Sequence, residues 1–216
     1  MLEVPLSGAY RPMRQALAAV EAVMTLPLLP TIPVRSVSAV HDGGEGAYVR
    51  QSDGTPLRVE ISADAEYPQL TTVHEFAHYL DDCGFGVRTG WASEEDPEME
   101  PLRQAWQKTE AVRLLHIGLE TGRMTAFLPG GGTTVFPLMP EDRDSCRYYL
   151  QGRELFARSY AQYVASKSDN RVLYRQLLQR RESVEGRFYH AQWTESDFYT
   201  VSRAFDELFG RLKWLR

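Results

Sequence analysis

The segment Gln69-Leu-Thr-Thr-Val-His-Glu-Phe-Ala-His-Tyr-Leu-Asp-Asp82 decides how the rest of the chain is interpreted. It follows Tyr67-Pro68, and neither proline nor glycine interrupts it before Gly84, so the sequence predicts a helix that ends near this glycine. Apolar residues recur along the segment at intervals of three or four positions, which predicts one buried face. These residues are Leu70, Val73, Ala77 and Leu80.

The middle of this helix carries two histidines, His74 and His78, with Glu75 directly after the first. Because four residues make just over one helical turn, both imidazoles leave the same face and can converge on one metal ion. A zinc ion with three protein ligands keeps a position for water and lowers the pKa of that water to about 7. The pattern therefore predicts a catalytic zinc site with Glu75 as general base. The alternative is a buried helix whose histidines only form hydrogen bonds.

A catalytic zinc site needs a third protein ligand, and no histidine follows His78 at the spacing of the extended HExxHxxGxxH motif. Downstream, residues 152–165 predict a second helix with Glu154 in its first turn. The small Ala157 would let this helix lie close to the histidine-bearing helix, which makes Glu154 the candidate third ligand. The alternative is a surface carboxylate that the dipole at a helix N-terminus favours.

Two motifs in combination, His74-Glu-Phe-Ala-His-Tyr-Leu-Asp-Asp82 and Glu154-Leu-Phe-Ala-Arg-Ser-Tyr160, resemble the catalytic domain of anthrax toxin lethal factor and its relatives. These relatives include the Pro-Pro endopeptidases, and all are gluzincins, zinc peptidases of zincin-like fold. The resemblance covers residues 40–165. It implies that His74, His78 and Glu154 bind zinc, that Glu75 is the base, and that the substrate is a peptide or protein.

The family also places a tyrosine a few residues before the ligand glutamate, where its hydroxyl donates a hydrogen bond to the tetrahedral oxyanion. Here Arg147-Tyr148-Tyr149 occupies that stretch, and the family spacing favours position 147, an arginine. The resemblance therefore implies this role for Tyr149, the first choice, or for Tyr148, the second. Packing in the core or in an interface is the alternative for both tyrosines.

Asp81 and Asp82 follow the second histidine by three and four residues. A carboxylate at such a position can accept a hydrogen bond from a ligating imidazole and so orient it. A solvated helix end is the alternative for this pair.

The composition restricts the class of protein. The chain has 216 residues, 43% of them hydrophobic, which suffices for one sizeable core. A net charge of -5 argues against general nucleic-acid binding. No apolar run of about 20 residues predicts a membrane span, and Glu21 interrupts any N-terminal signal segment. We therefore expect a cytoplasmic protein with neither nucleic-acid nor membrane partners, with export by a non-classical route as the alternative.

The two cysteines, Cys83 and Cys146, are too few for a disulfide framework. Neither of them belongs to a CxxC motif. A single bridge between them stays open.

The N-terminal part predicts an amphipathic helix over residues 12–24 and a proline-rich connector that ends at residue 33. We place a boundary there, so that residues 34–216 form the expected zincin-like catalytic domain, with C-terminal helices over 171–216. This boundary follows from the three prolines of the connector, which favour an extended chain.

Three alternating segments, 34–40, 47–50 and 57–62, predict a small mixed or antiparallel sheet, with a hairpin turn at 43–46. In zincins the strand before the metal-binding helix often lies at the sheet edge and pairs with an extended substrate. We therefore expect residues 57–62, or the neighbouring strand, at the rim of the cleft.

Other segments are interpreted by pattern alone. Residues 97–118 predict one long helix whose acidic beginning, 93–100, either complements the helix dipole or attracts basic substrates. The glycine-rich residues 130–140 predict a loop that either connects two elements or closes over a substrate. Residues 195–215 predict a helix capped by Thr194, with an apolar stripe that packs on the core or, alternatively, in a dimer.

The sequence thus predicts an α+β protein of zincin-like fold with a small sheet, an active-site helix and a mainly helical C-terminal part. Its expected activity is hydrolysis of peptide bonds by a zinc metallopeptidase that binds one Zn²⁺ per chain. Two alternatives stay open: a zinc-binding module without catalytic activity, and a regulatory peptidase with a single protein target.

Overall fold

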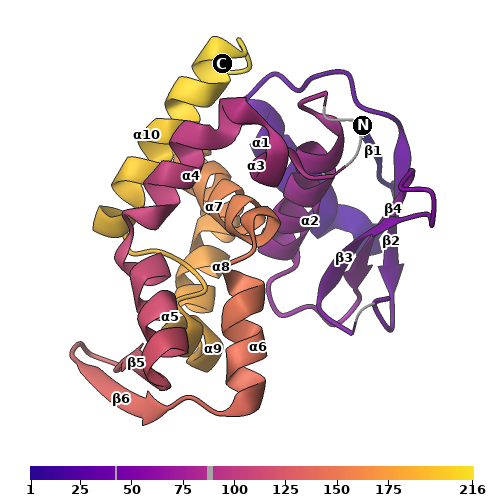
Figure 1. Cartoon of the computed structure of the whole chain (residues 1–216). Helices are drawn as coiled ribbons and strands as arrows, with labels where there is room; N and C mark the ends of the chain where they lie inside the picture. The colour runs from indigo at the N-terminus through magenta and orange to yellow at the C-terminus, as the bar shows by residue number, and fades with distance from the viewer. Residues whose placement is uncertain (42, 87–89) are drawn as a thin grey trace.

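A computed structural model describes residues 1–41, 43–86 and 90–216 of the chain. It has an α+β architecture in which a small sheet lies on one side and most helices lie on the other (Figure 1). The strands are β1 (Leu2–Glu3), β2 (Ile32–Val37), β3 (Gly46–Arg50), β4 (Pro56–Ser62), β5 (Arg123–Phe127) and β6 (Thr133–Pro137). The helices are α1 (Arg11–Val23), α2 (Pro68–Cys83), α3 (Ala92–Glu95), α4 (Glu100–Gln107), α5 (Glu110–Thr121), α6 (Pro140–Tyr149), α7 (Gly152–Lys167), α8 (Arg171–Glu182), α9 (Val184–Tyr189) and α10 (Glu195–Arg211).

The four-stranded sheet is mixed, with the strand order β1-β2-β4-β3. β2 runs parallel to β4 and β3 runs antiparallel to it, so that Val34 and Tyr48 both lie opposite Val59. The predicted hairpin turn at 43–46 is therefore wrong, because β4 lies between the two strands that this segment joins. The tight turn lies instead between β3 and β4, where Gly54 has a left-handed φ of 85°.

β3 is an edge strand of this sheet and lies against α2. The strand directly before the histidine-bearing helix, β4, is an interior strand. Of the two strands expected at the rim, residues 57–62 therefore lie inside the sheet, and the neighbouring strand β3 lies at its edge.

The predicted helix around the two histidines is confirmed as α2, which ends at Gly84. Its predicted apolar face is buried, with exposed fractions between 0% and 5% for Leu70, Val73, Ala77 and Leu80. The helix packs along α7, and small residues lie on both helices at this contact. No side chain of its own caps the start of α2; Gln176 of α8 accepts hydrogen bonds from the backbone of Gln69 and Leu70 instead.

Residues 1–33 belong to the same hydrophobic core as the rest of the described chain. Leu2 of β1 pairs with Ile32 of β2, and α1 buries Met13 and Val20 where it packs on α2. The proline-rich segment after α1 therefore joins two parts of one core and does not separate two cores.

The long helix predicted over 97–118 is broken into a short 3-10 turn, η2 (Pro97–Met99), and the two helices α4 and α5. Thr109 caps α5, and its side chain accepts from the backbone of Val112. Asp197, at the start of α10, also accepts from the backbone of Glu110 and Ala111 at 2.7 and 3.1 Å. A carboxylate distant in the sequence thus stabilises a helix start that periodicity alone does not reveal.

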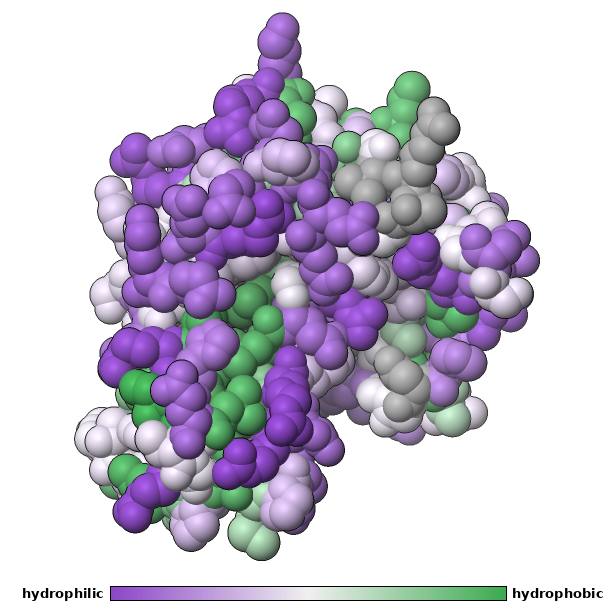
Figure 2. Space-filling view, in the orientation of Figure 1, coloured by the Kyte–Doolittle hydropathy of each residue, from purple (hydrophilic) through white to green (hydrophobic). Residues whose placement is uncertain are grey.

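Residues 130–140, predicted as a loop, complete a β-hairpin and begin α6. β5 pairs antiparallel with β6, and the turn contains three consecutive glycines with positive φ. The hairpin lies at the end of the helical part far from the four-stranded sheet (Figure 1). Hydrophobic surface gathers over this lower part of the molecule, whereas the upper part of the same face is mainly hydrophilic (Figure 2).

The last helix, α10, begins at the predicted cap Thr194, whose side chain accepts from the backbone of Asp197. Its apolar stripe is buried in the main core, as predicted.

Cys83 and Cys146 are both free, so they do not form the bridge that the sequence left open. Within the described ranges, no helix has the length and apolar character needed to cross a membrane.

Candidate metal centre

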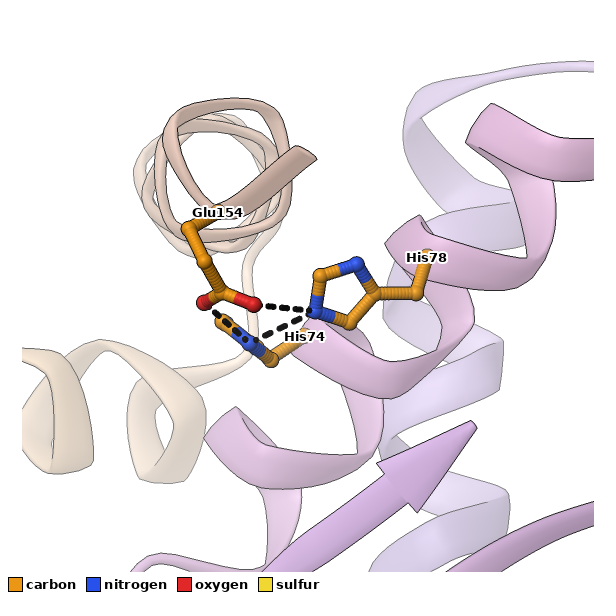
Figure 3. Close-up of side chains that lie close together, drawn as sticks. All are labelled: His74, His78 and Glu154. Carbon is orange, nitrogen blue, oxygen red and sulfur yellow. Dashed lines mark hydrogen bonds and ion pairs between the residues drawn. The ribbon is translucent and has the colours of Figure 1, made fainter. Parts of the chain in front are cut away.

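Three side chains that the sequence separates by up to 80 positions converge between α2 and α7. The Nε2 atoms of His74 and His78 lie 3.1 Å apart. One carboxylate oxygen of Glu154 lies 3.5 Å from the His74 nitrogen, and the other lies 3.2 Å from the His78 nitrogen. Figure 3 shows Glu154 pointing from α7 toward the two rings on α2. Within the described ranges, this is the only such group of three potential metal ligands.

These distances fit a tetrahedral metal ion. Zinc binds histidine nitrogen and carboxylate oxygen at about 2.0–2.2 Å, so two ligand atoms of a tetrahedral site are separated by roughly 3.3–3.5 Å. The two histidine nitrogens are 3.1 Å apart, and the 3.2 and 3.5 Å distances join them to different oxygens of Glu154; with one ligand atom from each residue, all separations are within 4.8 Å. The predicted ligands His74, His78 and Glu154 are therefore brought together in a geometry that can hold a metal ion.

The surroundings of the three ligands are largely closed. His78 and Glu154 retain only 7% and 3% of their exposure, while His74 is half-buried. Ala77 and Ala157 are fully buried between the two helices. Because neither residue has a long side chain, α7 lies close enough to α2 for the Glu154 carboxylate to reach both imidazoles, as the sequence predicted.

The charges of the three candidate ligands act strongly on one another. Burial by itself lowers the pKa of His78, but the carboxylates of Glu154, Glu75 and Asp81 outweigh this effect and raise the pKa to about 9. Burial opposes the charge of Glu154, yet the two histidines hold the pKa of its carboxyl well below the usual value. A metal ion that binds here replaces the proton on His78, so metal binding and proton release are linked.

The second ring nitrogen of His78, Nδ1, does not form the predicted hydrogen bond to Asp81 or Asp82. Its Nδ1 is buried and, within the described residues, has no hydrogen-bond partner. The Asp81 carboxylate accepts from the backbone and the hydroxyl of Ser93 at 2.7 and 2.6 Å. Asp82 accepts from the Tyr48 hydroxyl at 2.6 Å. The expectation that Asp81 or Asp82 orients an imidazole is therefore wrong, because other parts of the chain occupy both carboxylates.

A recess of about 730 Å³ opens beside the three ligands. The β2–β3 connection and the start of α2 line one side of it, and α6, α7, α8 and the segment after α9 line the other. Glu75 lines the recess next to His74 and is 6% exposed, so the predicted base lies beside the metal ligands and is not one of them. None of the described residues of the acidic stretch 93–100 or of 130–140 lines this recess.

Gly46, at the start of the edge strand, brings the backbone of β3 close to Glu75. A Cβ atom at Gly46 would lie 2.8 Å from Cγ of Glu75 and 2.6 Å from the methyl group of Thr71. The neighbouring Glu45 accepts hydrogen bonds from the Glu66 backbone at 3.0 Å and from the Thr71 hydroxyl at 3.2 Å. Together these contacts hold the edge strand against α2 and limit the space available to the Glu75 side chain.

We expect Gly46→Ala to lower the free energy of unfolding by about 1–3 kcal/mol, because the added methyl group overlaps Glu75 and Thr71. Urea denaturation of the metal-free protein measures this change. Gly8→Ala is the matched control, since a Cβ at Gly8 meets nothing within 4 Å. Equal stability of the two variants would show that β3 moves away from α2 at little cost.

The two candidate tyrosines point in different directions. The Tyr149 hydroxyl donates to Glu185, and its ring stacks on Tyr189 at a centroid distance of 5.5 Å. The Tyr148 side chain is 45% exposed, but its hydroxyl interacts with Glu154, and desolvation of this hydroxyl together with the charges of Glu154 and Glu75 raises the pKa of Tyr148. The structure does not favour Tyr149: of the two, Tyr148 is the tyrosine whose hydroxyl reaches Glu154 in the cluster of three candidate ligands. Both tyrosines line the recess, but adjacent residues on a helix point about 100° apart, so their hydroxyls reach different partners.

Several side chains that line the recess were not singled out from the sequence. Arg158 lies four residues after Glu154 on α7 and therefore on the same helical face, which was a detectable signal. No comparable local signal marks the other lining residues, because tertiary packing brings them to the recess: Gly46, Arg180, Glu185 and Gln192.

Comparisons with protein-family models, with curated proteins and with solved structures found no match to this chain.

Proposed function

We propose that this chain is a zinc-dependent endopeptidase of the gluzincin type, with His74, His78 and Glu154 as metal ligands and Glu75 as general base. The observation that carries the proposal is the convergence of two imidazole nitrogens and a carboxylate within 3.5 Å of one another. A structural zinc site has four protein ligands, whereas three ligands beside an open recess are typical of catalytic zinc.

Bound zinc would supply a Lewis acid that polarises a carbonyl group and lowers the pKa of a water molecule. Glu75 would take the proton from the attacking water at its carboxylate and transfer it to the leaving amine. The placement of Glu75 in the recess, directly after a metal ligand, supports this role. A purely structural metal site would not need a second carboxylate of this kind.

The arrangement of the elements around the site also supports a zincin-like fold. A mixed sheet has its edge strand β3 against the helix that carries both histidines, and the glutamate ligand comes from a second helix. An edge strand offers backbone N–H and C=O groups to an extended peptide, which would bring a scissile bond past the metal ligands. We therefore propose a peptide or protein as the substrate.

Tyr148 is the proposed donor to the oxyanion that forms during hydrolysis. We expect Tyr148→Phe to lower kcat by about 10²–10³-fold with little change in KM, because this hydrogen bond forms mainly in the transition state. Steady-state kinetics on one cleaved peptide measures both constants. Tyr149→Phe is the matched comparison and should have the smaller effect, since the Tyr149 hydroxyl is bonded to Glu185. The reverse order of effects would return the role to Tyr149.

The direct test of the proposed function combines metal analysis with cleavage of a diverse peptide library by protein purified without added zinc. About one zinc per chain, with cleavage that a chelator abolishes and zinc restores, is the expected result. Zinc without cleavage of any peptide or protein would indicate a non-catalytic module. Cleavage that persists in the chelated protein would contradict a metal-dependent mechanism.

A further inference from the structure

Arg158 is an arginine buried at the inner end of the recess, one helical turn beyond Glu154. Its side chain is 3% exposed and lines the recess. The guanidinium lies between two aromatic rings, 4.8 Å from the centroid of Tyr149 and 5.0 Å from that of Trp193. Such a position fixes the plane of the guanidinium and therefore the directions of its N–H groups.

The hydrogen bonds of Arg158 go to neutral carbonyl groups and not to a carboxylate. Its terminal nitrogens donate to the backbone carbonyls of Tyr149, His190 and Ala191 at 2.5, 3.3 and 3.1 Å. Nε is buried and has no partner, and within the described residues no carboxylate lies at ion-pair distance from Arg158. A buried cation without a counter-ion is costly, because carbonyl dipoles replace only part of its hydration.

The neighbouring carboxylates of Glu154 and Glu185 act on Arg158 only from beyond ion-pair distance. Glu185 is held by both terminal nitrogens of Arg180 at 2.7 Å and also accepts from the Tyr149 hydroxyl. Glu154 is directed to the two histidines. Among the described residues that line the recess, Arg158 is thus a charged side chain that no carboxylate binds directly.

Gln192 provides a second unsatisfied polar group on the same lining. Its Oε1 atom is buried without a hydrogen-bond partner, and the residue is 8% exposed. A side-chain amide can present either its oxygen or its nitrogen to a ligand by rotating its terminal group. Gln192 can therefore donate to an anion that occupies the space beside Arg158.

We propose that the inner end of this recess is a specificity site for a substrate carboxylate, bound by Arg158 with Gln192 as a second donor. This inference rests on the proposed function and names the substrate class as peptides with an acidic group near the scissile bond. Arg158 lies four residues from the ligand Glu154, a rise of about 6 Å along α7.

Two sources could provide this carboxylate: an aspartate or glutamate side chain, or the free C-terminus of a peptide. The test uses acetylated alanine hexapeptide amides with one aspartate at each position in turn, each paired with its asparagine counterpart. The same hexapeptide with a free C-terminal carboxylate is paired with its amide. Calorimetric titration of zinc-loaded Glu75→Gln protein measures binding without cleavage, and kcat/KM of the wild-type protein is measured in parallel.

We expect one acidic peptide to bind about 10–100-fold more tightly than its neutral partner, the effect of a hydrogen bond to a charged group. A preference for an aspartate peptide identifies a side chain as the source, and a preference for the free carboxylate identifies the C-terminus. Differences below about threefold for every pair, or no measurable binding by any acidic peptide, would overturn the proposal.

Variants separate recognition from a merely structural role of Arg158. Gln192→Glu places a carboxylate of the chain itself beside Arg158 and should reduce the ratio of acidic to neutral binding to about 1. Gln107→Glu on α4, which does not line the recess, is the matched control and should keep the wild-type ratio. Arg158→Met should also lose the ratio, and Gln192→Glu keeps the test decisive where Arg158→Met does not fold. An unchanged ratio in Gln192→Glu would contradict the assignment.

The outcomes also distinguish this site from the proposed function. If the protein binds acidic peptides but cleaves no peptide, the proposed carboxylate site is supported and the proposed peptidase activity is refuted. Zinc-dependent cleavage that is indifferent to acidic groups would retain the peptidase and refute the site.

Discussion

Glu75→Gln is expected to lower kcat/KM for any cleaved peptide by about 10²–10⁴-fold, the range that a positioned general base contributes. Glutamine has nearly the same shape as glutamate, but its amide cannot accept a proton from the attacking water. Glu75 is 6% exposed and lies against the edge strand at Gly46, so the substitution should change chemistry more than packing. The measurement is kcat/KM on the best peptide found in the library.

Zinc content is the internal control for this variant. Glu75 is not among the three clustered ligands, so Glu75→Gln should retain about one zinc per chain. Glu21→Gln, an exposed substitution on α1, is the matched control for loss of one carboxylate and should behave as wild type. Full peptidase activity of Glu75→Gln would make the proposed mechanism wrong.

Glu154→Gln is expected to weaken zinc binding by more than about 100-fold, because even groups that only support metal ligands contribute 10–100-fold. The substitution keeps the size of the side chain but removes the negative charge that draws the two histidines and the metal together. Competition with a chelator of known affinity measures the change. Peptidase activity should disappear at low zinc concentration and return in part when excess zinc is supplied.

The same Glu21→Gln variant controls for the loss of a carboxylate elsewhere in the chain. His78→Ala provides a second comparison, since it removes a ligand from α2 and should also weaken zinc binding strongly. If Glu154→Gln bound zinc as tightly as wild type while His78→Ala did not, the third ligand would have to come from another residue.

The helix that carries the histidines was predictable because its features are local. A spacing of four residues places His74 and His78 on one face in any α-helix, and the apolar stripe that includes Leu70 and Leu80 marks the buried face. Gly84 ends the helix as expected. Thr194 was predictable for the same reason, since its side chain caps the helix that directly follows.

Errors arose where contacts between distant segments decide the structure. The break between α4 and α5 depends on Asp197, nearly 90 residues later in the chain. The edge position of β3 depends on β2 pairing with β4, and alternation along a strand contains no information about its neighbour. The choice between Tyr148 and Tyr149 depends on how α6 is rotated about its axis, which the sequence does not show.

The sequence by itself therefore determined the helix that carries both histidines, its buried face and the shared direction of His74 and His78, because helix geometry orients side chains that lie within about a turn of each other. Glu154 was a candidate third ligand from the second helix and from the family resemblance. Only the tertiary structure decided that Glu154 reaches the two histidines, that the Tyr148 hydroxyl interacts with Glu154, and that Arg158 is buried without a directly paired carboxylate. These features depend on how α2, α6 and α7 pack against one another. That packing follows from the shape and burial of the whole core, which no single segment of the chain contains.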